Sequence, residues 1–304
     1  MKKILYTCMM MTALSLQAWA QELTYKEIKT IEKTIECNSK TSLSVKGERT
    51  FLTVQTWEKS YIQAKIEVIS KHTDKTQAST DLEKINVIFD KKGRKIIYSN
   101  ALRIKSPNDK PKSNLSVHVR LTIPESMDLD ISNAFGEIDI MGTYGVMTLA
   151  SEFTAINIHE FLGTSTLSSK YGDLNIDTYK GGLSLIADRS NLSMSDMTGN
   201  VDIEAKYGDI EIYYPLAPVS YKVQVSYSPM SIFIPSGYHE KVSLSCEDCE
   251  VISKDSSLPI SYSNDGTTQN AELFGTQSSN KPSRFFSEIE NIIVHTYQPT
   301  QKSN

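Results

Sequence analysis

The residues best placed to do chemistry in this sequence recur every 18 positions. One such position carries acidic residues in alternate repeats: Glu137, Ala155, Asp173, Asn191 and Asp209. A pair of carboxylates such as Asp173 and Asp209 could act as acid and base on a polysaccharide, because hydrolases hold two carboxyl groups about 5–9.5 Å apart. Carboxylates beside glycine turns can also hold calcium, but the nonapeptide repeats that do so carry more ligands per turn. We therefore predict no metal site and no cofactor.

A second recurring position carries rings and one guanidinium. Its residues are Phe135, Phe153, Tyr171, Arg189 and Tyr207. Cation–π stacking suits a guanidinium between two rings, so these side chains form either a ladder that holds the repeats in register or an exposed strip that binds glycan or peptide. We favour the ladder. The candidate binding residues are Tyr171, Arg189, Tyr207, Asp173 and Asp209.

Three cysteines lie beyond the N-terminal leader described below, an odd number for an oxidising compartment. Cys246 and Cys249 have C-x-x-C spacing, but the flanking VSLS and EVIS alternate like strands. A redox pair needs a helix N-terminus, and a zinc site needs a second pair of ligands. We predict a structural disulfide among Cys37, Cys246 and Cys249, with one thiol left free or linked to a partner. The five histidines share no motif, so we predict no catalytic residues.

The elements that must position these residues are the repeats themselves, which align from residue 129 to 217 without an insertion. One apolar position is Ile138, Ile156, Leu174, Leu192 and Ile210, and the next is Ile140, Ile158, Ile176, Met194 and Ile212. Spacing by two indicates strands that turn alternate side chains inward. A repeat this short must stack on its neighbours to bury its apolar side. We therefore predict an all-β, single-stranded β-solenoid of two-strand rungs, stacked in parallel and capped by less regular β segments.

The segments on either side of the repeat divide the chain into further parts. Residues 1–20 combine two lysines, an apolar run and Ala18-Trp19-Ala20, which is typical of a signal peptide. We predict a β-strand region over 21–120 with a lysine-rich loop at about 71–84, a solenoid core over 121–235 and a β/loop region over 236–304. Within the last region, the Ser-, Asn- and Gln-rich segment 253–283 is expected to be mobile and to precede a final strand.

Charge is distributed unevenly along the chain. Residues 21–120 carry 20 Lys and Arg against 12 Asp and Glu, whereas residues 121–217 carry 4 against 15. The basic part lacks the clustered aromatic residues of a nucleic-acid groove, so no nucleic-acid partner is expected. No segment after the leader is apolar enough to span a membrane.

Five segments carry a resemblance to a known family. They are FLTVQTWEKSYIQAKIEV, NAFGEIDI, SKYGDLNID, AKYGDIEIYYP and IENIIVHT. They resemble the exported bacterial β-strand-repeat proteins of unknown function called putative adhesins, which are GIN-domain-like. The resemblance implies a β-solenoid in the cell envelope or on the cell surface, and it implies no enzymatic activity. The second and fourth repeats, SEFTAINI and DRSNLSM, depart from the Tyr-Gly-Asp signature.

These observations predict a non-catalytic, adhesin-like scaffold in the periplasm or outside the cell that binds an unknown glycan or protein. The first alternative is a polysaccharide lyase or hydrolase that uses Asp173 and Asp209. The second is an accessory of an envelope-signalling system of the anti-sigma type.

Overall fold

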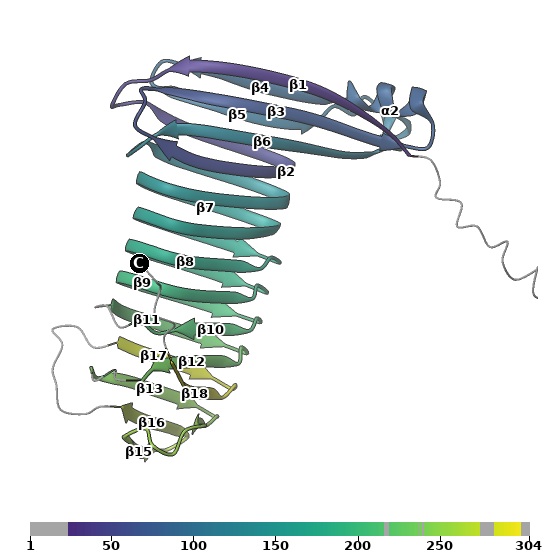
Figure 1. Cartoon of the computed structure of the whole chain (residues 1–304). Helices are drawn as coiled ribbons and strands as arrows, with labels where there is room; N and C mark the ends of the chain where they lie inside the picture. The colour runs from purple at the N-terminus through teal and green to yellow at the C-terminus, as the bar shows by residue number, and fades with distance from the viewer. Residues whose placement is uncertain (1–23, 216–218, 237, 239, 274–282, 299–304) are drawn as a thin grey trace, which may run out of the picture.

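The computed structural model describes residues 24–215, 219–236, 238, 240–273 and 283–298. Within these ranges the chain forms an 18-stranded sheet, one α-helix and one 3-10 turn (Figure 1). The predicted all-β class is confirmed. The predicted signal peptide, residues 1–20, lies outside the described ranges. No helix in these ranges has the length and apolar character needed to cross a membrane.

Four strands carry the 18-residue repeat: β7 (Asp128–Lys170), β8 (Leu174–Asp188), β9 (Leu192–Lys206) and β10 (Ile210–Tyr213). Ile156 pairs with Leu174, Leu174 with Leu192, and Leu192 with Ile210, all in parallel. Figure 1 shows these strands as successive turns stacked along one axis. We call each turn a rung. The register therefore follows the predicted period.

The core of this stack includes the two apolar positions that Ile138 and Ile140 begin, together with the apolar side chains of the opposite strand in each rung. The ten side chains of these two positions, from Ile138 to Ile212, are each at most 1% exposed. A buried ladder of aromatic rings also fills one corner of the stack. There the ring of Phe161 stacks between Tyr144 and Tyr179 at centroid distances of 5.1 and 4.7 Å. The Tyr179 hydroxyl donates a hydrogen bond to the Gly182 carbonyl (2.8 Å). This satisfies a polar group that would be costly to bury alone.

At its N-terminal end the stack is continued by β2 (Ser42–Trp57). Leu43 pairs in parallel with Leu129, and Leu52 with Ile138. Further strands cover this rung and form a cap: β1 (Tyr25–Glu36), β3 (Tyr61–His72), β4 (Ile85–Lys92), β5 (Lys95–Leu102) and β6 (Asn114–Pro124). Strands β5 and β6 pair in parallel with β2, while β1, β3 and β4 pair antiparallel within the cap. The cap closes a sheet end whose unpaired backbone groups would otherwise be open to other chains.

The cap contains an element that the sequence did not predict. Where a lysine-rich loop was expected at about 71–84, the chain forms α2 (Lys75–Leu82), whose N-cap is the side chain of Asp74. The buried carboxylate of Asp81 explains the difference. It accepts hydrogen bonds from the backbone amides of Lys112 (2.8 Å) and Ser113 (2.9 Å), and so ties the helix to the segment that follows the 3-10 turn η1 (Pro107–Asp109).

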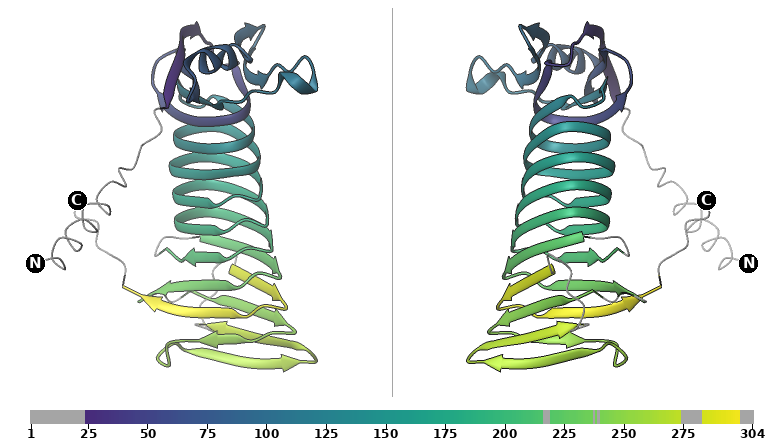
Figure 2. Two further views of the ribbon diagram at one scale, coloured as in Figure 1. Left: turned by 90° about the vertical axis from the view of Figure 1, so that its right-hand side faces the viewer. Right: turned by 90° about the vertical axis from the view of Figure 1, so that its left-hand side faces the viewer.

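The C-terminal strands extend the stack, but not in chain order. They are β11 (Val219–Ser226), β12 (Met230–Pro235), β13 (Val242–Glu247), β14 (Val251–Ser253), β15 (Ile260–Asp265), β16 (Thr268–Leu273), β17 (Ser283–Glu288) and β18 (Ile292–Tyr297). Strands β17 and β18 lie between the β11/β12 rung and the β13/β14 rung, and pair in parallel with both (Figure 2). The antiparallel hairpin β15–β16 covers the far end. The segment expected to be mobile therefore contains ordered strands over 260–273.

Candidate functional site

The predicted ladder of Phe135, Phe153, Tyr171, Arg189 and Tyr207 is present at an exposed corner of the stack, and we call it the corner ladder. It is longer than expected. Phe153 stacks between Phe135 and Tyr171 at 5.1 and 4.8 Å, with interplanar angles of 5°. The Arg189 guanidinium lies 5.5 Å from the Tyr171 ring and 4.9 Å from the Tyr207 ring. The ladder continues to Tyr227, 5.1 Å from Tyr207. The structure thus brings Tyr171, Arg189 and Tyr207 together.

Backbone conformation explains why this corner requires particular residues. Every ladder residue has a positive φ, from 50° at Phe153 to 62° at Phe135, which costs a side-chain-bearing residue about 1–2 kcal/mol. Glycine follows three of them, and a Cβ on Gly136, Gly172 or Gly208 would lie 2.1 Å from a carbonyl oxygen of the adjacent rung. The recurring pair of an aromatic residue and glycine therefore makes a tight corner, and ring stacking offsets part of the strain.

The ladder is poorly suited to hold a sugar. A sugar ring stacks on the face of an aromatic ring, but each inner ring here has a ring or guanidinium over both faces. Only the edges are open, which is consistent with exposures of 40–48% for the aromatic members. This geometry fits a role in holding the register.

The acidic column beside the ladder is bridged by asparagine. The Asn191 side-chain amide donates to Asp173 Oδ1 (3.0 Å), and the Asn191 side-chain oxygen accepts from the Asp209 backbone amide (3.0 Å). Asp173 and Asp209 lie two rungs apart, which corresponds to roughly 10 Å. Within the described residues, no three His, Cys, Asp or Glu side chains are grouped as metal ligands.

The cysteines divide into a pair and a single thiol. Cys246 and Cys249 form a disulfide across the corner of the β13/β14 rung. Cys37 is free and half-buried, and its Sγ donates to the Ile35 carbonyl (3.4 Å). Burial raises the pKa of the Cys37 thiol above its usual value, so the thiol is protonated at neutral pH.

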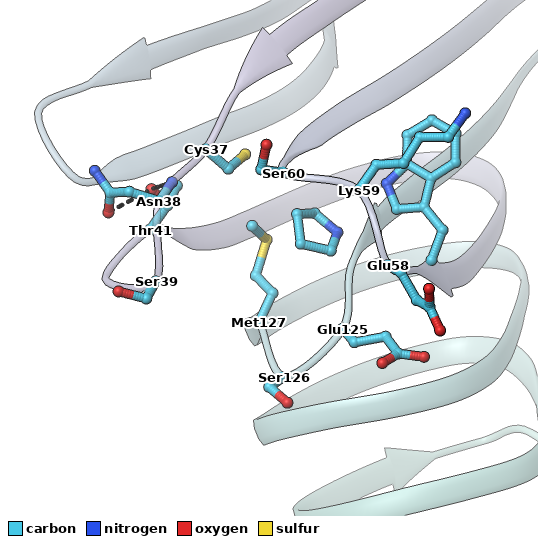
Figure 3. A pocket seen from close by; sticks show the side chains of 12 residues that line it. Cys37, Asn38, Ser39, Thr41, Glu58, Lys59, Ser60, Glu125, Ser126 and Met127 are labelled. Atoms are coloured by element: carbon cyan, nitrogen blue, oxygen red, sulfur yellow. Dashed lines mark hydrogen bonds between the residues drawn. The ribbon is translucent and has the colours of Figure 1, made fainter.

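Cys37 belongs to a pocket of about 370 Å³ at the junction of the cap and the stack, which we call the junction pocket (Figure 3). Three connecting segments form it, those between β1 and β2, between β2 and β3, and between β6 and β7. Its lining residues are Cys37, Asn38, Ser39, Thr41, Trp57, Glu58, Lys59, Ser60, Pro124, Glu125, Ser126 and Met127. In Figure 3, Cys37 and Ser60 lie on one side of the pocket and Met127 on the other.

Backbone hydrogen bonds hold the three segments together. The Cys37 amide donates to the Ser60 carbonyl (2.8 Å), and the Glu125 amide donates to the Trp57 carbonyl (2.9 Å). The first segment is a tight turn, in which the Asn38 amide donates to Thr41 Oγ1 (3.0 Å). These hydrogen bonds therefore fix the backbone that surrounds the pocket.

The Trp57 side chain is fixed on several sides. Its Nε1 donates to the Tyr61 carbonyl (2.9 Å), and the two rings pack edge to face at 4.7 Å. Lys59 Nζ lies 4.6 Å from the indole centroid, where a cation is attracted to the ring. An indole held in this way is a rigid apolar surface at the pocket.

Polar groups complete the lining. Glu58 and Glu125 contribute carboxylates and are exposed, and three serines contribute hydroxyls. The lining contains no histidine, and the one thiol is held protonated. This combination of an indole, carboxylates and hydroxyls suits the recognition of a polar ligand with apolar faces better than nucleophilic catalysis.

Sequence reasoning missed the junction pocket. Trp57, outside the predicted leader the only tryptophan in the sequence, was a signal that could have indicated it. The place of Cys37 and Glu125 in the pocket lining could not be predicted from local sequence patterns, because these residues are far apart in the sequence.

No protein-family model and no curated protein matches the chain. The solved structures to which the chain is similar comprise eight chains and include the following three. A "putative cell adhesion protein" from Clostridium sporogenes is 11% identical, with a TM-score of 0.27 over 89% of this chain and 100% of that one. A "putative adhesin" from Bacteroides fragilis is 9% identical, with a TM-score of 0.45 over 88% and 97%. A "putative lipid binding protein" from Parabacteroides distasonis is 8% identical, with a TM-score of 0.34 over 88% and 96%.

Proposed function

We propose that this protein is a non-catalytic, adhesin-like scaffold of the bacterial envelope or cell surface that binds a glycan in the junction pocket. The observation that carries this proposal is the rigid indole of Trp57 beside the carboxylates of Glu58 and Glu125 in a preformed pocket. A sugar offers apolar C–H groups to the part of the indole that Lys59 and Tyr61 leave exposed, and hydroxyl donors to the carboxylates. The volume of about 370 Å³ lies in the usual range for small-ligand sites.

The architecture supports the scaffold part of the proposal. In-register parallel pairing over successive rungs fits a single-stranded β-solenoid. Such a stack would hold the junction pocket, near its N-terminal end, at a fixed distance from its C-terminal end. Parallel rungs extend to β2 and to β17/β18, beyond the predicted core over 121–235. We assign the corner ladder, with Tyr171, Arg189 and Tyr207, the structural role of keeping this register.

Export and location belong to the same proposal. The leader at 1–20 and the disulfide between Cys246 and Cys249 suit an oxidising compartment. Cell fractionation combined with surface proteolysis tests this. Recovery of an uncleaved chain in the cytoplasm would refute export.

Glycan binding is tested on arrays with a chain that begins at Gln21. Truncating an aromatic anchor costs about 2 kcal/mol, so Trp57→Ala should weaken binding to any positive glycan by about thirtyfold. Glu125→Gln should also weaken binding, while Glu152→Gln, a matched change at an exposed glutamate outside the pocket, should not. Thermal melting of each variant checks that the fold is retained. Blank arrays, or binding that survives both pocket variants, would refute the proposal.

A further inference from the structure

Among the described residues, the rung that comes last in the sequence is not the last rung in the stack. Strands β17 and β18 are inserted between two rungs that both precede them in sequence (Figures 1 and 2). The backbone confirms this order at the corner. Tyr227 N donates to the Glu288 carbonyl (3.2 Å), and Ile289 N donates to the Glu247 carbonyl (2.9 Å). Residues 283–297, which we call the inserted rung, therefore fill a slot between two rungs that earlier parts of the chain provide.

The inserted rung fits this slot like any other rung. Phe285, Ile292 and Val294 point into the core and are at most 2% exposed. The Ser283 hydroxyl contacts the Tyr214 hydroxyl and accepts from the Tyr221 amide (3.1 Å). On the outer side, the Ser226 hydroxyl donates to Glu288 Oε2 (2.9 Å).

The two rungs that flank the slot also match each other. Lys222 and Ser243 both pair with Arg284, and Met230 and Val251 both pair with Ile292. Each of these two pairs is 21 residues apart, so removal of the inserted rung would allow β11/β12 to pair with β13/β14 in one register.

This direct pairing would keep the inward positions apolar. Val223 would meet Leu244, Val225 would meet Cys246, and Met230 would meet Val251, all now buried. The slot could therefore close without leaving two unpaired sheet edges. That lowers the free-energy cost of releasing the inserted rung, because the two sheet edges that it leaves would pair with each other.

We propose that the inserted rung is exchangeable, and that residues 283–297 of a second copy of this chain can occupy the same slot, giving a reciprocally swapped dimer. Inner rungs such as β8 continue into rungs on both sides, so they cannot leave without disrupting their neighbours. The inserted rung follows the β15–β16 hairpin in the sequence, and no later strand of the described residues continues from it into another rung. Exchange of an identical element between copies makes a dimer from contacts that the monomer already has. This proposal is independent of glycan binding.

The test uses the full mature chain with Cys37→Ser, so that the only reduced thiols are introduced ones. Ser226→Cys and Glu288→Cys are made in separate proteins, because these two positions pair across the slot. The folded proteins are mixed without denaturant, oxidised gently and analysed by non-reducing electrophoresis. The control mixture combines Asn175→Cys with Ser193→Cys, which pair across two inner rungs. The double variant Ser226→Cys/Glu288→Cys checks the register within one chain.

Exchange predicts a cross-linked heterodimer in the Ser226→Cys and Glu288→Cys mixture and none in the control mixture. An excess of a synthetic peptide of residues 283–298 should reduce the heterodimer band. Three results would overturn the proposal: a double variant that forms its internal cross-link while the mixture yields no dimer, equal dimer in both mixtures, or failure of the double variant to cross-link within one chain.

Discussion

Replacing a corner glycine tests how tightly the rungs are stacked. In Gly172→Ala the new Cβ would lie 2.1 Å from the Thr154 carbonyl oxygen of the next rung. Relief requires the backbones to separate by about 1 Å, roughly a fifth of the ~4.8 Å strand spacing. The cost should reach about 3 kcal/mol, the upper end of what overpacking causes. Gly172 has no positive φ, so the effect is steric.

The matched control is Gly182→Ala in the following strand. Its new Cβ would meet nothing nearer than a Thr164 methyl at 3.5 Å, and alanine reduces the entropy of the unfolded chain. We expect a change between zero and about 1 kcal/mol of added stability.

Urea denaturation followed by circular dichroism measures both variants. With an m-value of about 3 kcal/mol/M, Gly172→Ala should lower the midpoint by about 1 M, and Gly182→Ala should leave it unchanged or raise it slightly. Equal midpoints for the two variants would refute close in-register stacking at this corner.

Three further predictions concern the cap, the ladder and the free thiol. Burial alone would raise the pKa of Asp81, but hydrogen bonds from Lys84, Gln77 and Ser113 outweigh it and hold that pKa well below its usual range. The unfolded state then binds the proton more tightly. The stabilisation from Asp81 is therefore present above about pH 4 and is lost as the pH falls further. Asp81→Asn should cost about 3 kcal/mol and weaken this acid dependence, as acid and urea titrations would show; an unchanged acid midpoint would contradict it. Arg189→Ala should cost about 1 kcal/mol, since a cation–π contact contributes about that much, and Arg189→Tyr should restore it; equal melting of both variants would argue against the ladder. Iodoacetamide should alkylate Cys37 more slowly at pH 7.5 than an unhindered thiol of pKa about 8.5, because burial raises the pKa of Cys37; mass spectrometry that finds faster reaction would refute this.

The register of the middle of the chain was predictable because local spacing determines it. Ile138 and its counterparts 18 residues apart must face one core. Strands this short can bury these apolar side chains only by stacking in parallel. The corner ladder followed from the same alignment, since Tyr171, Arg189 and Tyr207 occupy one position of the repeat. The close approach of adjacent rungs at this corner accounts for the glycine that follows three of the ladder residues.

Other features depend on contacts between distant segments, which no local pattern encodes. A final strand was predicted, and Ile292–Tyr297 form it as β18, but its place between β12 and β14 follows from where the preceding rungs end. The helix α2 depends on Asp81 binding the backbone at Lys112 and Ser113. The junction pocket arises where three connecting segments meet, so Trp57, Cys37 and Glu125 become neighbours only in the folded chain.

The central claim, that the junction pocket binds a glycan, is tested most directly by the fluorescence of Trp57. In a chain that begins at Gln21, Trp57 is the single tryptophan, so its emission reports on the pocket alone. Titration with a glycan that is positive on the array should shift or quench this emission along a saturable curve, and Glu125→Gln should move the curve to higher concentration. Binding detected by calorimetry with no change in Trp57 emission would place the glycan elsewhere and contradict the assignment.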